Sequence, residues 1–186
     1  MELRYQLKFF SQWRSDAGTS FGAATDNAVV RDACGLPYFP GKTLKGLFRE
    51  SVEDYINFMD AKRSDEVDVI FGGEAKEGIC HFTDATFSEK EANAILSHKL
   101  QKYLYHNITT TAIDEKGIAE KNSLRTIEAV VPCTLYGTIY NIPEESFDLL
   151  KNCMGFIKYI GMHRNRGFGR CQLSIIEEGG ESHDQY

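Results

Sequence analysis

The sequence predicts one α+β domain with a ferredoxin-like core in the order βαββαβ. Apolar residues alternate with polar ones in several separated stretches, which is the period of half-buried strands. Two other stretches carry apolar residues at spacings of three and four, the period of amphipathic helices. In chain order these stretches give the split βαβ pattern, which places both helices on one face of an antiparallel sheet.

The first part of the chain predicts a strand, a loop and a helix. Residues 2–12 alternate between apolar and polar side chains, as in a half-buried strand. Residues 13–28 are rich in glycine, serine and threonine, and this loop is long enough to be functional. After the Pro40-Gly41 turn, residues 43–59 predict a helix. Its apolar stripe consists of Leu44, Leu47, Phe48, Val52, Tyr55, Ile56 and Met59.

The second predicted strand covers residues 79–87, with a break at the polar pair Thr83-Asp84. The charged stretch 61–68 before it is expected to be exposed. Residues 70–73 are expected to form a compact apolar turn.

Residues 88–124 show no strong period and predict an insertion that projects from the domain. Within it, Lys116-Gly117 is a turn signal, so residues 113–118 are expected to form the tip of an extended hairpin.

The last third of the chain predicts a strand, a helix and a strand. Residues 125–140 alternate well, with Pro132 expected at a bulge or an edge position. Pro143 is expected to open a helix whose apolar stripe continues to Ile160. A loop rich in glycine and arginine follows. The remaining segments are a strand over 170–176 and a loose acidic tail over 177–186.

The composition limits the class of protein. A chain of 186 residues fits a single domain over residues 1–186, and 42% apolar residues are enough for a core. No apolar run approaches the roughly 18 residues of a membrane span, and the N-terminus has no signal-peptide core, so a cytoplasmic protein is expected. The five cysteines form no CxxC pair, which argues against a zinc site or a disulfide framework.

The charge pattern restricts where nucleic acid can bind. The net charge of −6 argues against a generic nucleic-acid-binding surface but allows a local basic groove. Positive charge gathers at the start of the helix over 43–59, where Lys42, Lys45 and Arg49 share a face. A basic helix N-terminus after a tight turn suits a phosphate group. The glycine-rich loop offers a second basic group, Arg164, Arg166 and Arg170 around Phe168, which is able to stack on a base.

Two other nucleotide-binding modes fit less well. A P-loop needs a glycine five residues before Gly41, where the chain has Leu36, and Pro40 removes a backbone donor. A module of the RNA-recognition-motif (RRM) type shares the βαββαβ topology but stacks bases on aromatic residues of its sheet. No such aromatic pattern stands out here, so RNA contacts are expected through loops and helix ends.

Four segments together resemble the signature of the RAMP superfamily, the repeat-associated backbone proteins of CRISPR effector complexes. DNAVVRD…GLPYFPGKTLKGLFR, over 26–49, is similar to the family's N/S-P-V-I-K/R-D turn and its P-x-I-P-G-S-S-L-K-G-x-x-R helix start. Ile70-Phe71-Gly72 is similar to L-F-G. Residues 78–85 are similar to G-x-L-x-F-x-D-A, and residues 164–170 to S-R-G-F-G. The matches keep the family's order over residues 26–173 and resemble most the repeated backbone subunit of type III complexes.

The resemblance implies an RNA-binding role. Such subunits polymerise along a guide RNA (crRNA), bind the complementary target RNA, and contact further copies of themselves and other type III subunits. Each copy reaches a thumb, here residues 98–122 with Ile113, Lys116 and Ile118, between guide and target. The residues expected to contact RNA are Arg31, Lys42, Thr43, Lys45, Arg49, Arg164, Arg166, Phe168 and Arg170.

The resemblance also implies that Asp26 is the catalytic residue of a metal-dependent endoribonuclease. In RNA the 2′-hydroxyl is a tethered nucleophile, so proximity to the phosphate is already provided. Asp26 is expected either to orient or deprotonate that hydroxyl, or to hold a hydrated divalent ion, Mg²⁺ or Mn²⁺. Both roles remain open.

Two departures from the family pattern keep alternatives open. The segment 14–22 replaces the family's His-x-Gly-Gly, and Asn27-Ala28 replaces its N/S-Pro next to Asp26. The alternatives are a non-catalytic RNA-binding scaffold, a capping subunit of the same complex, and a stand-alone crRNA-processing RAMP endoribonuclease. That last class relies on a histidine base, and the Asp26 stretch contains no histidine.

Overall fold

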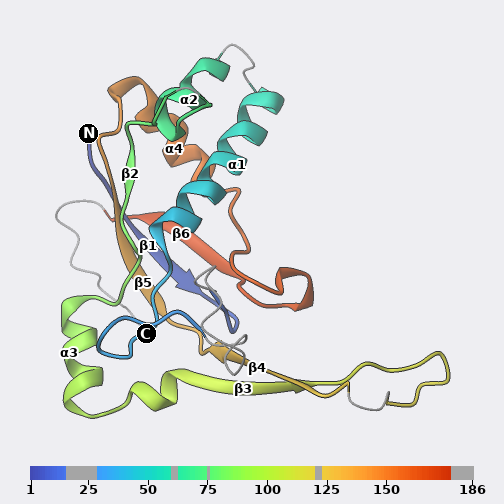
Figure 1. Cartoon of the computed structure of the whole chain (residues 1–186). Helices are drawn as coiled ribbons and strands as arrows, with labels where there is room; N and C mark the ends of the chain where they lie inside the picture. Colours follow the sequence, from blue (N-terminus) through green and yellow to red (C-terminus); the bar gives the residue numbers. More distant parts are fainter. Residues whose placement is uncertain (16–28, 60–62, 75, 120–122, 177–186) are drawn as a thin grey trace, which may run out of the picture.

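The computed structural model describes residues 1–15, 29–59, 63–74, 76–119 and 123–176 (Figure 1). Its main sheet has four strands in the order β2-β5-β1-β6, and every neighbouring pair is antiparallel. Helix α1 connects β1 to β2, and helix α4 connects β5 to β6, so the predicted ferredoxin-like βαββαβ core is confirmed. The elements of this core are β1 (Leu3–Phe9), α1 (Gly41–Met59), β2 (His81–Phe82), β5 (Thr134–Tyr140), α4 (Phe147–Met154) and β6 (Cys171–Ile175).

Strand β1 is the centre of the sheet and of the core. It pairs with β5 on one side and β6 on the other, and its alternate residues Leu3, Tyr5, Leu7 and Phe9 are buried. These side chains face the helical layer. Phe48 of α1 lies there, with its ring centroid 6.3 Å from that of Tyr5. The alternation predicted for residues 2–12 therefore places the odd-numbered side chains of β1 in the core and the even-numbered ones on the outer face of the sheet.

Residues Ser64–Phe71 form a helix, α2, where the sequence predicted an exposed charged stretch followed by a turn. That prediction is wrong, because Val67, Ile70 and Phe71 are buried in the core. Their spacing of three and four was a helical signal, but the window of eight residues is short and four of them are polar. The C-cap, Gly72, donates its backbone N–H to the carbonyl of Asp68.

The insertion between β2 and β5 contains more regular structure than its sequence indicated. It begins with helix α3 (Glu89–Ser97), whose start is a capping box in which Ser88 and Glu91 bond reciprocally. The Ser-x-x-Glu spacing was the overlooked signal. The remaining elements of the insertion are the 3₁₀ helix η2 (Gln101–Leu104) and the strands β3 (Tyr105–Thr110) and β4 (Arg125–Val130).

Strands β3 and β4 pair with each other as a separate two-stranded sheet that projects sideways from the body (Figure 1). The single strand predicted over 125–140 is therefore two strands in two sheets, β4 and β5, which separate around Pro132. The helix predicted from Pro143 begins as the 3₁₀ turn η3 (Glu144–Ser146) and ends at Met154, short of Ile160. The break predicted at Thr83-Asp84 is present, because β2 ends at Phe82 and the Thr83 hydroxyl oxygen accepts a hydrogen bond from the Thr138 N–H.

The glycine-rich loop is closed at its stem. The N–H of Ile160 donates to the carbonyl of Gly169 at 2.9 Å, and Tyr159 pairs with Arg170. Gly169 has φ +68°, and a Cβ built there would lie 1.8 Å from the Ile160 carbonyl oxygen. Only glycine therefore fits this position. Gly167 also has a left-handed φ of +83°, but nothing lies within 4 Å of its Cβ position.

Two findings concern the whole described part of the chain. All five cysteines are free thiols, as expected from their spacing. None of the helices described is both long enough and apolar enough to cross a bilayer.

Gly169→Ala is expected to destabilise the fold much more than Gly167→Ala. Both substitutions place alanine in a left-handed conformation, which costs about 1 to 2 kcal/mol. Only the first also forces a Cβ into the Ile160 carbonyl, which raises the expected loss to at least about 3 kcal/mol. Urea unfolding followed by circular dichroism measures both losses. Equal losses for the two variants would contradict the stem geometry.

Candidate functional site

Asp26 lies outside the described residues, but the described residues on either side of its segment are joined. The N–H of Val30 donates to the carbonyl of Ser15 at 3.1 Å. The described residues on the two sides of segment 16–28 therefore lie at one place.

This place is the end of a short segment, Gln12–Ser15, which we call the hub. Its carbonyl groups accept hydrogen bonds from the N–H groups of Gly169 at 2.7 Å and Met162 at 2.9 Å, both in the glycine-rich loop. Trp13 pairs through its backbone with Val130 of β4, in both directions. The hub thus joins the glycine-rich loop, the base of the β3-β4 hairpin and both ends of the Asp26 segment.

A cluster of three side chains ties the end of the Asp26 segment to the hairpin. The Glu128 carboxylate accepts a hydrogen bond from the Val29 N–H at 3.1 Å and forms an ion pair with Arg31 at 2.5 Å. The Arg31 guanidinium lies 3.8 Å from the ring centroid of Tyr105, whose hydroxyl donates to the Gly35 carbonyl. Desolvation raises the pKa of Tyr105 well above its ordinary value, so its hydroxyl keeps the proton for this bond. Arg31, predicted to contact RNA, thus has its guanidinium in intramolecular contacts.

The start of α1 presents its positive charge through side chains. Lys42 and Thr43 are exposed, and Lys45 is half-buried. The first N–H of the helix, at Gly41, donates to the Asp84 carboxylate at 2.7 Å. Because this carboxylate already occupies the helix terminus, a phosphate there has Lys42, Thr43 and Lys45 as its available partners.

Arg49 is bound to its own chain. Its guanidinium bonds Glu53 at 2.8 Å and the Gly72 carbonyl at 2.9 Å, and lies 3.6 Å from Asp68. These contacts hold the end of α2 against α1. Lys45 and Arg49 also border a polar cleft of about 830 Å³ whose other wall is formed by residues 71–74 and 76–81. Burial raises the pKa of the Cys80 thiol in this wall to about 11, so it is neutral at physiological pH.

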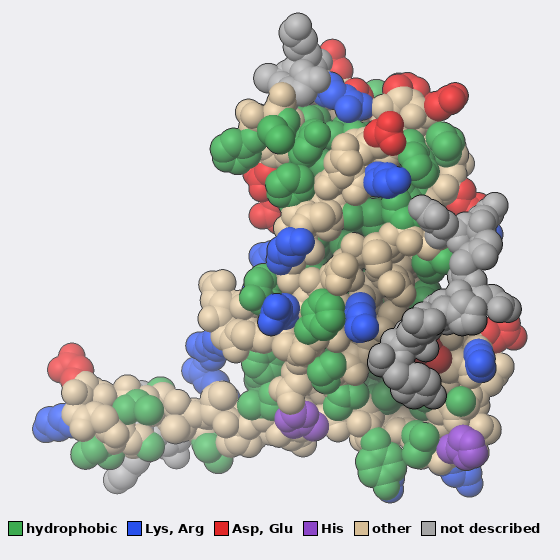
Figure 2. Space-filling model, turned by 180° about the vertical axis from the view of Figure 1, so that it is seen from behind, with side chains coloured by type: hydrophobic (Ala, Val, Ile, Leu, Met, Phe, Trp, Pro, Cys, Tyr) green, Lys and Arg blue, Asp and Glu red, His purple; other side chains and the backbone are tan. Residues whose placement is uncertain are grey.

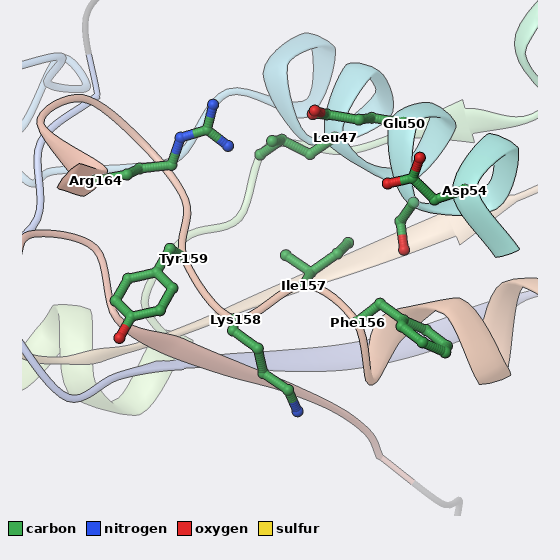
Figure 3. A pocket seen from close by; sticks show the side chains of 9 residues that line it. Leu47, Glu50, Asp54, Phe156, Ile157, Lys158, Tyr159 and Arg164 are labelled. Carbon is green, nitrogen blue, oxygen red and sulfur yellow. The ribbon is translucent and has the colours of Figure 1, made fainter.

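The glycine-rich loop presents two arginines to solvent. Arg164 and Arg166 belong to the 3₁₀ helix η4 (Arg164–Arg166) and are exposed, while Phe168 is half-buried with its ring 5.8 Å from that of His163. Arg164 extends toward Leu47 and Glu50 of α1, across a pocket of about 260 Å³ (Figure 3). Arg170 follows the loop, exposed and 5.9 Å from the ring centroid of Phe10.

The tip of the hairpin is a tight turn over residues 114–118. The Asp114 carboxylate accepts the N–H groups of Lys116 and Ile118 at 2.9 and 2.8 Å. Ile113 pairs with Ala119 near the tip. Ile113 and Ile118 are 66% and 62% exposed, and Lys116 is exposed as well. Two apolar side chains and one cation are thus held far from the body.

The sequence-predicted residues therefore fall into separate places. The hub joins the ends of the Asp26 segment to the glycine-rich loop and the hairpin base, whereas Lys42 and Lys45 lie at the start of α1 and Arg49 belongs to a contact between helices. Sequence reasoning missed Glu128, Tyr105 and Phe10. No local pattern identified Glu128 and Tyr105, because their roles depend on contacts with Val29 and Arg31. For Phe10, the signal was its even number in the alternation of residues 2–12, which places an aromatic ring on the polar face of the strand.

In the part of the chain that is described, no group of three or more histidine, cysteine, aspartate or glutamate side chains is arranged to hold a metal ion.

Comparisons with known proteins give a consistent result. The model of the RAMP superfamily matches residues 7–172. Among solved structures, a chain of the cryo-EM structure of the type III-B Cmr-beta bound to cognate target RNA is 20% identical with a TM-score of 0.66. That match covers 95% of this chain and 60% of the other. A chain of the Cmr-beta structure in the apo state is 12% identical with a TM-score of 0.69, covering 96% and 98%.

This chain thus spans less than two thirds of the first of these two similar chains. A search of curated proteins found no match. At these identities the solved structures support the fold, and the family follows from the match over most of the sequence: the chain belongs to the RAMP superfamily.

Proposed function

We propose that this chain is a guide-RNA-binding backbone subunit of a type III CRISPR effector complex, and that it cleaves complementary target RNA through Asp26. The observation that carries the proposal is the hub, Gln12–Ser15, which joins the glycine-rich loop, the hairpin base and both ends of the Asp26 segment. Asp26 precedes Val29 by three residues, so chain connectivity alone limits the distance between them to roughly 11 Å. The family match and the similarity to chains of type III-B Cmr-beta support this role.

Two basic surfaces provide the proposed contacts to the guide RNA. At the start of α1, Lys42, Thr43 and Lys45 provide two cations and a hydroxyl for backbone phosphates. On the glycine-rich loop, Arg164 and Arg166 are exposed and able to reach phosphates, and Arg170 continues this group. Phe168 stacks on a base or on the ribose side of the same strand. Arg49 acts at this surface by keeping α1 and α2 together.

The β3-β4 hairpin acts as the thumb between guide and target. Its tip places the apolar side chains of Ile113 and Ile118 where they displace a base pair. An apolar side chain inserted between neighbouring bases unstacks them. Lys116 contacts a phosphate beside that position. The two-stranded sheet gives this long arm a backbone with paired hydrogen bonds along β3 and β4.

Cleavage follows from the chemistry of RNA. The 2′-oxygen attacks the adjacent phosphorus, the bond to the 5′-oxygen breaks, and the products are a 2′,3′-cyclic phosphate and a 5′-hydroxyl. The proton of the 2′-hydroxyl passes to a base, and the leaving oxygen takes a proton from water. Asp26 either accepts that first proton or orients the hydroxyl through a bound metal ion.

A divalent cation, Mg²⁺ or Mn²⁺, is the proposed cofactor. The nearest described carboxylate to the end of the Asp26 segment is Glu128, and its oxygens are bonded to Arg31 and the Val29 N–H. Asp26 and the RNA phosphate are the donors that we propose for the ion. This set suits Mg²⁺, which keeps several water ligands and needs few protein carboxylates. The ion would neutralise charge on the scissile phosphate.

Assembly is proposed to be a head-to-tail filament of copies along the guide RNA, together with other type III subunits. A heterologous interface of this kind propagates as a helix when its rotation does not close.

A second candidate function is the same scaffold without cleavage. It is favoured by Asn27-Ala28, which replaces the family's proline-containing pair beside Asp26 and removes the rigidity that proline gives to a loop.

Asp26→Ala is expected to abolish cleavage of a complementary RNA by the assembled complex while leaving RNA affinity unchanged, because the carboxylate acts on the reaction. The matched control is Asp16→Ala, which removes another aspartate of the same segment and is expected to keep cleavage. Product formation on denaturing gels and filter binding measure the two properties. Unchanged cleavage by the Asp26 variant would refute the catalytic role and favour the scaffold.

Lys42→Ala and Arg49→Ala are expected to change two different properties, RNA binding and folding stability. Removing Lys42 should weaken RNA binding and reduce the slope of log K against log salt by about 0.7, the value for one lost contact to a single strand. Removing Arg49 should mainly lower the free energy of unfolding, because its contacts are to Glu53, Asp68 and Gly72. Salt titrations and urea unfolding of both variants test this. A salt slope that falls only for Arg49 would reverse the assignment.

Glu128→Ala is expected to slow cleavage about 10- to 100-fold, because a displacement of about 1 Å in a catalytic group has effects of this size. The change removes the carboxylate that holds the Val29 N–H and Arg31. RNA affinity should stay close to that of the wild type. The control is Glu53→Ala, which removes an ion pair on α1. Single-turnover cleavage by the assembled complex measures the rates, and equal rates for both variants would contradict a positioning role.

A further inference from the structure

The outer face of the main sheet carries an exposed aromatic ring that sequence reasoning overlooked. The even-numbered residues of β1 point to this face, away from the helices, and Phe10 continues their series just beyond the strand. Its side chain is 48% exposed. Figure 2 shows the molecule from behind, with lysine and arginine side chains beside hydrophobic ones in the middle of this face, above the base of the hairpin.

The backbone fixes Phe10 beside the stem of the glycine-rich loop. The Phe10 N–H donates to the Arg170 carbonyl at 2.8 Å, and the Arg170 N–H donates to the Ser11 hydroxyl oxygen at 2.9 Å. The backbone that carries the ring is therefore held in place before any ligand binds, which lowers the conformational entropy lost on binding.

Two cations lie over this ring at a distance longer than direct contact. The Lys8 ammonium and the Arg170 guanidinium each lie 5.9 Å from the ring centroid. By comparison, Arg31 packs on Tyr105 at 3.8 Å, which is direct contact. Neither Lys8 nor Arg170 forms an ion pair with any described residue. Both charges thus remain available to a ligand that approaches the ring.

We propose that Phe10 is a stacking platform for one base of single-stranded RNA, with Lys8 and Arg170 bound to the phosphates on either side of that base. This inference rests on the proposed function, in that it assumes that the chain binds RNA. An exposed aromatic ring beside two cations that pair with no described carboxylate meets both requirements of single-strand binding, which are a face for stacking and positive charge along the backbone.

The surroundings favour RNA over a protein partner. Next to Lys8, the outer face carries polar side chains, among them Gln6 and Gln172, with Tyr136 opposite Gln6. A stable protein interface buries about 800 Å² on each partner, and the polar residues around Phe10 favour a smaller, charged ligand. The chain has a net charge of −6, so two cations that form no ion pair with a described residue are a local exception that attracts an anion.

The platform is also connected to the hairpin. Two residues beyond Phe10, the Gln12 amide nitrogen lies 3.2 and 3.1 Å from the two ring nitrogens of His106, at the start of β3. A strand that stacks on Phe10 therefore continues toward the base of the thumb over polar side chains.

The test measures binding of a short fluorescein-labelled oligouridine to the full chain by fluorescence anisotropy. Phe10→Ala is expected to raise the Kd at least about 5-fold, the lower end for loss of one base–aromatic stack. Phe10→Trp keeps a stacking face and should bind as well as the wild type. Phe58→Ala is the matched control, because Phe58 of α1 is 87% exposed and lies outside the proposed RNA surfaces. Ultraviolet crosslinking of the oligouridine, mapped by mass spectrometry, should label residue 10.

Three outcomes would overturn the inference. If the wild type binds no oligouridine, the proposed function and this inference fail together. If Phe10→Ala binds like the wild type while Lys42→Ala binds more weakly, the proposed function survives and the platform does not. If Phe10→Ala keeps its RNA affinity but no longer assembles with other copies or subunits, Phe10 contacts a protein.

Discussion

The arrangement of the molecule depends on the backbone pairing of the hub, Gln12–Ser15. Four residues beyond the central strand bond to the glycine-rich loop, to β4 and to Val30. Trp13 anchors this segment, because its side chain is fully buried and stacks on Phe9 with centroids 4.5 Å apart. Buried backbone groups must find partners, so the segment has little freedom to shift independently of the three elements that it joins.

The charge distribution separates cations that maintain the fold from cations that are available to a ligand. Arg31 and Arg49 lie against carboxylates and carbonyl groups of their own chain, whereas Lys42, Arg164 and Arg166 are exposed. Exposed ion pairs contribute little stability, but a guanidinium that also bonds a carbonyl fixes geometry. A net negative chain is therefore compatible with local basic surfaces.

The thumb is inserted where the fold tolerates it. Strands β2 and β5 are antiparallel neighbours, so the end of β2 and the start of β5 lie at the same end of the sheet. Lengthening such a loop adds little closure entropy, because the cost rises only with the logarithm of its length. The insertion then gains its own order from the β3-β4 pairing and from the contacts of Tyr105 and Glu128 with residues 29–35.

The sequence by itself determined the βαββαβ order, the inward face of β1, the helix over residues 43–59 and the turn near Lys116-Gly117. These features follow from local periodicity and turn chemistry, which a linear pattern records. Only the tertiary structure decided that Arg49 binds within its own chain, that Glu128 holds Val29, and that residues 125–140 divide between two sheets. It also decided that Phe10 stands between two cations. Each of these depends on residues distant in the chain, and no local pattern specifies which distant partner packing brings into contact.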